Sequence, residues 1–166
     1  MKVFLLTIGL WLLALSSSSA QDMKMADVFR QMPDSLMPYL TENNRLDFID
    51  FLDSNMKAEV RNKLGGISEM TTLADDSLSI RMSESSRCDM FLMTLDEPMD
   101  TITQVVVVIE TFMVDSIYGD SSVKYYTPNW IRLSQQPPLN EAQERIIRRN
   151  ALQNLLKREE ELLNKR

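Results

Sequence analysis

The sequence contains no histidine, and this absence excludes several common chemistries at once. Ser-His-Asp and Cys-His catalysis both depend on an imidazole that titrates near neutral pH. Zinc and copper(II) sites that are built on imidazole are excluded for the same reason. We therefore expect a protein without a catalytic residue of these classes, without a metal site and without a cofactor. Carboxylate, lysine, tyrosine or methionine chemistry remains open.

Cysteine is almost absent, because Cys88 stands alone and no intrachain disulfide can form. A nucleophilic cysteine needs a basic partner, usually histidine, that keeps it as a thiolate. Arg87 is adjacent in sequence, but consecutive residues of a strand point to opposite faces. We predict that Cys88 is a small buried residue of the strand "CDMFLMTL", with a reactive thiol as the alternative.

Basic residues are outnumbered, 18 to 24, which gives a formal net charge of −6. The charge is uneven, because residues 140–166 hold seven basic and five acidic residues. The preceding body is therefore strongly acidic and repels phosphate backbones, so we expect no nucleic-acid binding.

The first twenty residues, "MKVFLLTIGLWLLALSSSSA", have the pattern of a secretory signal peptide. Lys2 precedes an apolar run, and Ser18 and Ala20 occupy the −3 and −1 positions of a cleavage site before Gln21. The run is shorter than the roughly 20 apolar residues that span a bilayer. We expect an exported protein, periplasmic or at the cell surface, with no integral membrane segment in the mature chain.

Residues 21–134 predict one α+β domain. Thr41 is a suitable N-cap, and Leu46, Ile49 and Leu52 recur at the spacing of an amphipathic helix. Residues 56–66 fit either a continuation of this helix to Gly65 or a hairpin closed by Gly65 and Gly66, and the alternation slightly favours the hairpin.

The middle of the chain has the alternation and β-branched content of strands, in the stretches 78–82, 88–95, 102–114 and 123–127. Short turns separate these stretches, so the expected fold is an antiparallel β-meander of four to five strands with an N-terminal amphipathic helix and a C-terminal helix.

The end of the chain has two parts. Residues 135–140, "QQPPLN", predict a proline-rich linker. Residues 141–166 predict a charged amphipathic helix, with Asn140 and Gln143 as a capping box.

Several stretches resemble a known family: "MPDSLMPYLTENNRLDFIDFLDSNMKAEV", "DDSLSIRMSESS" and "KYYTPNW". The chain is similar over residues 24–133 to exported proteins of Bacteroides-type Gram-negative anaerobes, a family of unknown function. The resemblance implies a periplasmic or cell-surface location and supplies no activity, cofactor or catalytic residue. It also implies further strands after "YYTPNW", where this chain has the linker and a helix, so a sheet edge is expected to be exposed or covered by a partner.

The best candidate binding residues are Tyr125, Tyr126, Asn129 and Trp130, which gather three aromatic rings and an amide within six positions. Such groups form sugar-binding platforms in exported proteins, although a core strand with a tryptophan at its rim is the commoner arrangement.

Other patterns are better explained by structure than by function. The acidic rows fit a solvated helix face or turns better than a calcium site. The S-x-x-K spacing falls on a strand, and methionine is common as core filler rather than as a copper(I) ligand. The residues concerned are Asp47, Asp50, Asp53, Asp115, Asp120, Ser121 and Lys124.

The sequence therefore favours a non-catalytic binding or interaction module, with a protein or a glycan as its ligand. A protein partner or a second copy would bind through the segment from Asn140 to Arg166 and a sheet edge. The alternatives are a carboxylate-based hydrolase, which needs two acids in one cleft, and a structural subunit of the envelope.

Overall fold

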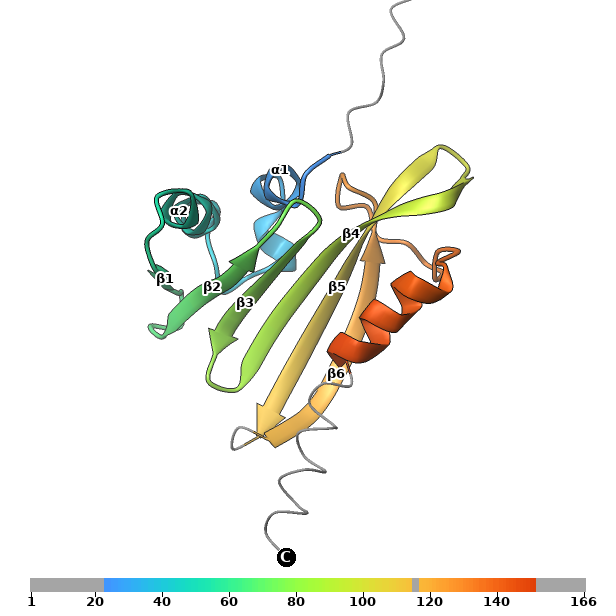
Figure 1. Cartoon of the computed structure of the whole chain (residues 1–166). Helices are drawn as coiled ribbons and strands as arrows, with labels where there is room; N and C mark the ends of the chain where they lie inside the picture. The colour runs from blue at the N-terminus through green and yellow to red at the C-terminus, as the bar shows by residue number, and fades with distance from the viewer. Residues whose placement is uncertain (1–22, 115–116, 152–166) are drawn as a thin grey trace, which may run out of the picture.

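The computed structural model describes residues 23–114 and 117–151. The predicted signal peptide, its cleavage site at Ala20 and Gln21, Asp115, and the predicted helix beyond residue 151 lie outside these residues. The described chain is an α+β structure in which helices cover both faces of one antiparallel sheet (Figure 1). Within it, no helix is both long and apolar enough to cross a membrane.

The sheet is a meander in which each strand pairs with the next along the chain. The antiparallel meander is confirmed, but the expected four to five strands are six. They are β1 (Ala58–Arg61), β2 (Ile67–Leu73), β3 (Ser77–Ser83), β4 (Ser86–Met99), β5 (Ile102–Val114) and β6 (Ile117–Tyr126).

Strands β1 and β2 lie outside the four predicted stretches, and their pairing settles the ambiguity of residues 56–66 in favour of the hairpin. The preceding helix ends at Asp53, and Asn55 adopts a left-handed φ of 54° that reverses the chain. Asn62 shapes the turn, because its Oδ1 accepts hydrogen bonds from the backbone N–H of Leu64 and Gly66. Gly65 has φ 82°, a conformation that favours glycine.

One face of the sheet is covered by α1 (Met25–Arg30), the short 3-10 helix η1 (Asp34–Leu36) and α2 (Glu42–Asp53). Thr41 and Asn44 form a reciprocal capping box at the start of α2. The buried face of α2 is centred one residue earlier than the sequence suggests, because Arg45, Phe48 and Ile49 are its buried residues. Leu46 is only half-buried.

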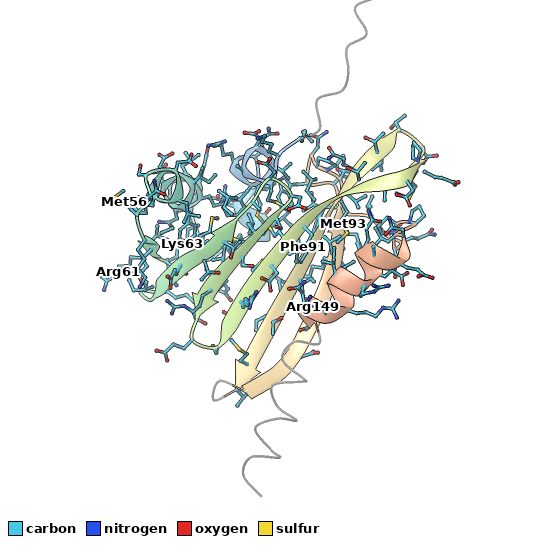
Figure 2. The ribbon with its side chains drawn as sticks, viewed as in Figure 1. Met56, Arg61, Lys63, Phe91, Met93 and Arg149 are labelled. Atoms are coloured by element: carbon cyan, nitrogen blue, oxygen red, sulfur yellow. The ribbon has the colours of Figure 1, made fainter. Side chains whose placement is uncertain are left out.

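The other face is covered in part by the C-terminal helix, described over residues 141–151. Its capping box is confirmed, since Asn140 and Gln143 exchange backbone-to-side-chain hydrogen bonds of 3.0 and 2.9 Å. Ile147 packs on Val105, Val107 and Ile109, with the residues Phe91 and Met93 of β4 beside them (Figure 2). The two faces of β5 thus belong to two separate cores.

Arg45 ties the irregular segment 32–40 to α2. Its guanidinium is 2% exposed and donates to the Asp34 carboxylate at 2.8 Å and to the Met32 carbonyl at 2.6 Å. Its Nε has no hydrogen-bond partner among the described residues. Segment 32–40 is therefore held by a buried cation as well as by apolar contact.

The Arg45–Asp34 pair predicts a pH-dependent stability. The hydrogen bond from Arg45 lowers the pKa of Asp34 below its ordinary value of 3.8. A lowered folded-state pKa contributes stability above the ordinary value, and this contribution is lost as the pH falls through the folded-state pKa. We expect Asp34→Asn to lower the free energy of unfolding at pH 7 and to have little effect near pH 2. Urea unfolding across this range measures the difference, and Asp47→Asn on the exposed face of α2 is the control; a pH-independent difference would contradict the prediction.

Candidate functional site

The predicted aromatic residues do not form one surface. Tyr126 and Trp130 lie in the core beneath α1, with relative exposures of 5% and 7%. Their ring centroids are 5.7 Å apart, and the indole Nε1 donates to the Val28 carbonyl at 2.8 Å. The polar edge of Trp130 is thus already used inside the protein.

The other two candidates lie elsewhere. Tyr125 points to the opposite face of the sheet, because neighbouring residues of a strand alternate, and it packs near Ile147 of the C-terminal helix. Burial, together with the nearby charge of Glu144, raises the pKa of Tyr125. Asn129 is exposed in the turn before Trp130. These residues are close in sequence, but their side chains lie apart because neighbouring residues of β6 point to opposite faces of the sheet.

The Trp130 hydrogen bond gives a test of its structural role. Trp130→Phe keeps most of the buried ring but removes the indole donor, so the Val28 carbonyl keeps only the 3.2 Å bond from the Gln31 N–H. Losing one such hydrogen bond costs about 0.5–1.5 kcal/mol. Urea unfolding measures the loss. Tyr39→Phe, at an exposed tyrosine, is a control that we expect to leave stability unchanged. Equal stabilities for Trp130→Phe and the unaltered chain would show that the buried bond contributes nothing.

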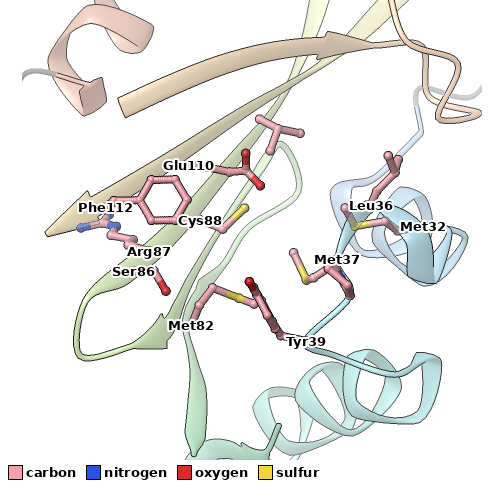
Figure 3. Close-up of a pocket in the computed structure, with 12 residues that line it drawn as sticks. Met32, Leu36, Met37, Tyr39, Met82, Ser86, Arg87, Cys88, Glu110 and Phe112 are labelled. Atoms are coloured by element: carbon pink, nitrogen blue, oxygen red, sulfur yellow. The ribbon is translucent and has the colours of Figure 1, made fainter. Parts of the chain in front are cut away.

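A different place has the character of a binding site. A pocket opens between segment 32–39 and the lower ends of β3, β4 and β5, on the face that carries α1 and α2 (Figure 3). Its volume is about 60 Å³. We call it the methionine pocket, and it is lined by Met32, Leu36, Met37, Pro38, Tyr39, Met82, Ser86, Arg87, Cys88, Val108, Glu110 and Phe112.

The mouth of the methionine pocket carries two exposed aromatic side chains. Tyr39 is 46% and Phe112 55% exposed, and they come from segment 32–40 and from β5 respectively. Glu110 lies between the pocket and β6, where its carboxylate pairs with Lys124 and accepts a 3.3 Å hydrogen bond from Ser122. The opening is thus apolar at its centre and charged at one rim.

Cys88 lines the pocket as a neutral thiol. It is 4% exposed, and burial, with the charges of Glu110 and Asp89 in a smaller role, raises its pKa well above the ordinary range. This burial confirms the prediction of a small buried residue. A thiol that stays protonated is a poor nucleophile, which argues against the alternative of a reactive thiol.

The state of Cys88 can be measured directly. With little thiolate and little access, Cys88 should react with a soluble aromatic disulfide reagent at least about 100-fold more slowly in the folded chain than in urea. Absorbance of the released thiolate at pH 8 follows both reactions. Comparable rates in the two states would mean that the pocket presents a reactive cysteine.

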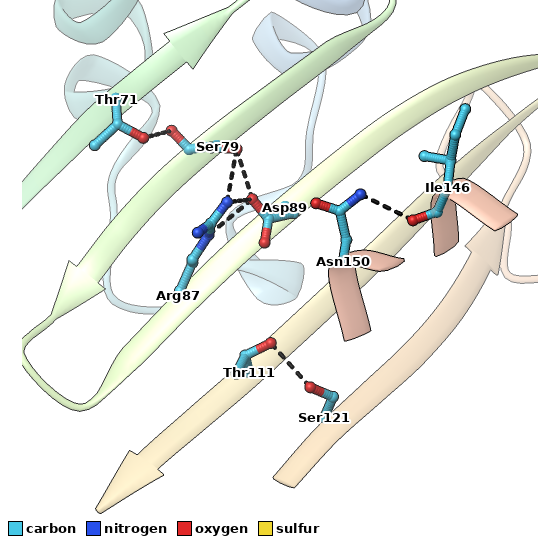
Figure 4. Close-up of polar contacts among 8 residues, drawn as sticks. All are labelled: Thr71, Ser79, Arg87, Asp89, Thr111, Ser121, Ile146 and Asn150. Carbon is cyan, nitrogen blue, oxygen red and sulfur yellow. Dashed lines mark hydrogen bonds and ion pairs between the residues drawn. The ribbon is translucent and has the colours of Figure 1, made fainter. Parts of the chain in front are cut away.

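On the opposite face, a polar network surrounds a buried carboxylate (Figure 4). Asp89 is 1% exposed, and its Oδ1 accepts from Ser79 Oγ at 2.5 Å and from Arg87 Nη2 at 2.7 Å. Serine catalysis needs a base that takes the hydroxyl proton and a third group that orients this base, whereas here the Asp89 carboxylate is paired with Arg87. The network satisfies a buried charge and supports the sheet.

Among the residues that the structure describes, the remaining acidic patterns are not brought into a catalytic arrangement. Asp27, Asp53 and Asp75 line one open depression beside α1, but Asp27 pairs with Arg30 at 2.8 Å and Asp75 with Lys24 at 3.1 Å. Asp47, Asp50 and Asp53 are exposed along α2. The described residues include no group of three His, Cys, Asp or Glu side chains that could hold a metal ion.

The S-x-x-K pair is likewise divided by the sheet. Ser121 bonds to Thr111 on one face at 3.0 Å, while Lys124 pairs with Glu110 on the other. Sequence reasoning did not find the methionine pocket, because its walls come from three separate segments. The only hint was the abundance of methionine.

Comparison with known proteins finds a family but no assigned activity. Residues 15–155 match the family described as "Protein of unknown function (DUF3256)". This match includes the linker and the start of the C-terminal helix, which the sequence resemblance had left out. No curated protein matches the chain.

A solved structure shows the same fold. It is a domain of an uncharacterized protein from Porphyromonas gingivalis, 20% identical to this chain, with a TM-score of 0.55. The alignment covers 74% of this chain and 66% of that one, so the chain spans just under two thirds of its length. At this identity the likeness concerns the fold alone.

Proposed function

This chain belongs to the DUF3256 family of proteins of unknown function, and we propose that it is a non-catalytic interaction module that holds an apolar side chain of a protein partner in the methionine pocket. We propose further that it works in the periplasm or at the cell surface. The signal-like first twenty residues support that location.

The size of the methionine pocket carries the choice of ligand. Small-molecule sites usually enclose roughly 300–1,000 Å³. A pocket of about 60 Å³ is too small for such a ligand. It suits a single apolar side chain that a larger partner inserts.

The lining of the pocket suits an apolar anchor. Methionine side chains are flexible and polarizable, so Met32, Met37 and Met82 can adjust to the shape of the group that enters. Tyr39 and Phe112 at the mouth are of the residue class that dominates binding energy at protein interfaces. Exposed aromatic side chains beside a preformed cavity are what such an interface requires.

The other functions have less support. A glycan platform would need Tyr125, Tyr126 and Trp130 on one exposed surface, and two of these rings lie in the core. A carboxylate-based hydrolase would need a protonated acid in an apolar enclosure. Of the three acids beside α1, Asp27 and Asp75 are paired with cations at the surface. A structural envelope subunit has no observation of its own in its favour.

The proposal predicts that filling the pocket weakens partner contact. A photo-crosslinking phenylalanine analogue at position 112 should give one discrete adduct in cells that contain the native envelope. Cys88→Leu adds two carbon-sized groups at the pocket wall, and we expect it to reduce that adduct at least about tenfold because the anchor no longer fits.

The control places the same analogue at Ile131, which is 65% exposed and lies outside the pocket. It should give no such adduct. Thermal unfolding of purified Cys88→Leu establishes that the variant is folded. An adduct that survives the filled pocket, or that also forms from position 131, would refute a role of the pocket in binding.

A further inference from the structure

The outer edge of β6 carries an incomplete seventh strand. Residues 131–133 turn back along β6, where Tyr126 bridges to Arg132 and the Leu133 N–H donates to the Tyr125 carbonyl at 2.9 Å. The chain then leaves the sheet. The outer edge of β6 therefore accepts an extended segment, but residues 131–133 pair only with its last two residues, Tyr125 and Tyr126.

Two prolines explain why the chain does not continue. In the antiparallel register set by Tyr126 and Arg132, Pro137 would fall opposite Ser121. Proline has no N–H and cannot donate to a neighbouring strand. The lower edge of β6 is consequently left without a strand from the described part of this chain.

The backbone groups at this edge can be assigned by alternation. The Tyr125 carbonyl faces outward, so the N–H and C=O groups of Val123 and Ser121 also face away from β5. The Ser121 N–H donates to its neighbour Asp120 at 2.8 Å. Among the described residues, Val123 has no backbone partner on this side.

A second copy of the chain does not fit this edge. The free part of the β6 edge spans residues 120–124, because Gly119 forms a bulge below it and segment 131–133 occupies Tyr125 and Tyr126 above it. Two copies that pair over this stretch must share a two-fold axis at Ser122. Gly119 of the second copy would then lie beside Tyr125, where Leu133 already sits.

The geometry points to strand addition at the β6 edge: an extended segment of another protein pairs with Ser121 and Val123 and places a lysine or arginine beside Asp120. Strand addition of this kind takes its affinity from main-chain hydrogen bonds and its selectivity from alternate side chains. Asp120 is exposed and has no ion pair among the described residues. A cation on the added strand would complement it and the acidic body.

This surface is separate from the methionine pocket but adjoins it. Asp120 lies directly opposite Phe112 in the sheet, so the added strand would run about two strand spacings, roughly 10 Å, from the pocket mouth. The proposal does not depend on occupation of the pocket.

The test selects linear seven-residue peptides from a random display library on the chain from Gln21 to Arg166. We expect the enriched peptides to carry lysine or arginine, and to bind Val123→Pro at least tenfold more weakly because the outward N–H is lost. Val123→Ala, which shortens the side chain and keeps the N–H, should bind within twofold of the unaltered chain. Asp120→Lys should reverse the charge of the selected peptides.

A second measurement leaves the protein unchanged, in case Val123→Pro fails to fold. A selected peptide is methylated at every second amide nitrogen, in two versions. Methylation of the amides that face β6 should abolish binding, and methylation of the amides that face away should leave it unchanged. The proposal would be overturned if the peptides bound Val123→Pro as tightly as the unaltered chain. It would also be overturned if Cys88→Leu, rather than Val123→Pro, weakened their binding. Binding that appears only when residues 152–166 are deleted would overturn it as well, since the chain's own tail would then be the occupant.

Discussion

The buried guanidinium of Arg45 is the interaction on which the candidate site depends. Segment 32–40 has only one short 3-10 helix, and prolines interrupt it twice, so it has little regular hydrogen bonding of its own. Arg45 supplies two fixed contacts to this segment, at Asp34 and at the Met32 carbonyl. One wall of the methionine pocket is built from this segment. These two contacts offset the cost of burying the Arg45 cation, and they hold the irregular segment 32–40 in a defined shape.

The sheet divides the molecule into two halves of different character. One face carries α1, η1 and α2 and the larger core, and the pocket lies where that cover ends. The other face packs apolar side chains beneath the C-terminal helix, and further along it carries the Asp89 network. The methionine pocket and the outer edge of β6 both lie where the elements that cover the sheet end. A partner can bind there without displacing packed side chains.

Local signals predicted the local structure well. Alternation and β-branched residues predicted the strands, and Thr41 and Asn140 predicted the starts of two helices, because each signal acts within a few residues. The short strand β1 was uncertain, since four residues give little periodicity. The separation of the predicted aromatic residues could not be read from the sequence, because Trp130 bonds to Val28, which lies 102 residues away in sequence. The methionine pocket was out of reach for the same reason, since only tertiary structure brings its segments together.

The bond from Trp130 to Val28 also bears on the order in which the chain is made. Every strand of the meander pairs with its predecessor, so the sheet can grow as the polypeptide emerges. Helix α1 cannot receive the hydrogen bond from the Trp130 indole until residue 130 has been made, 102 residues after Val28. The earliest segment of the body therefore waits longest for its final contact. The nascent chain therefore lacks this native contact, and is not yet fully folded, during most of its synthesis.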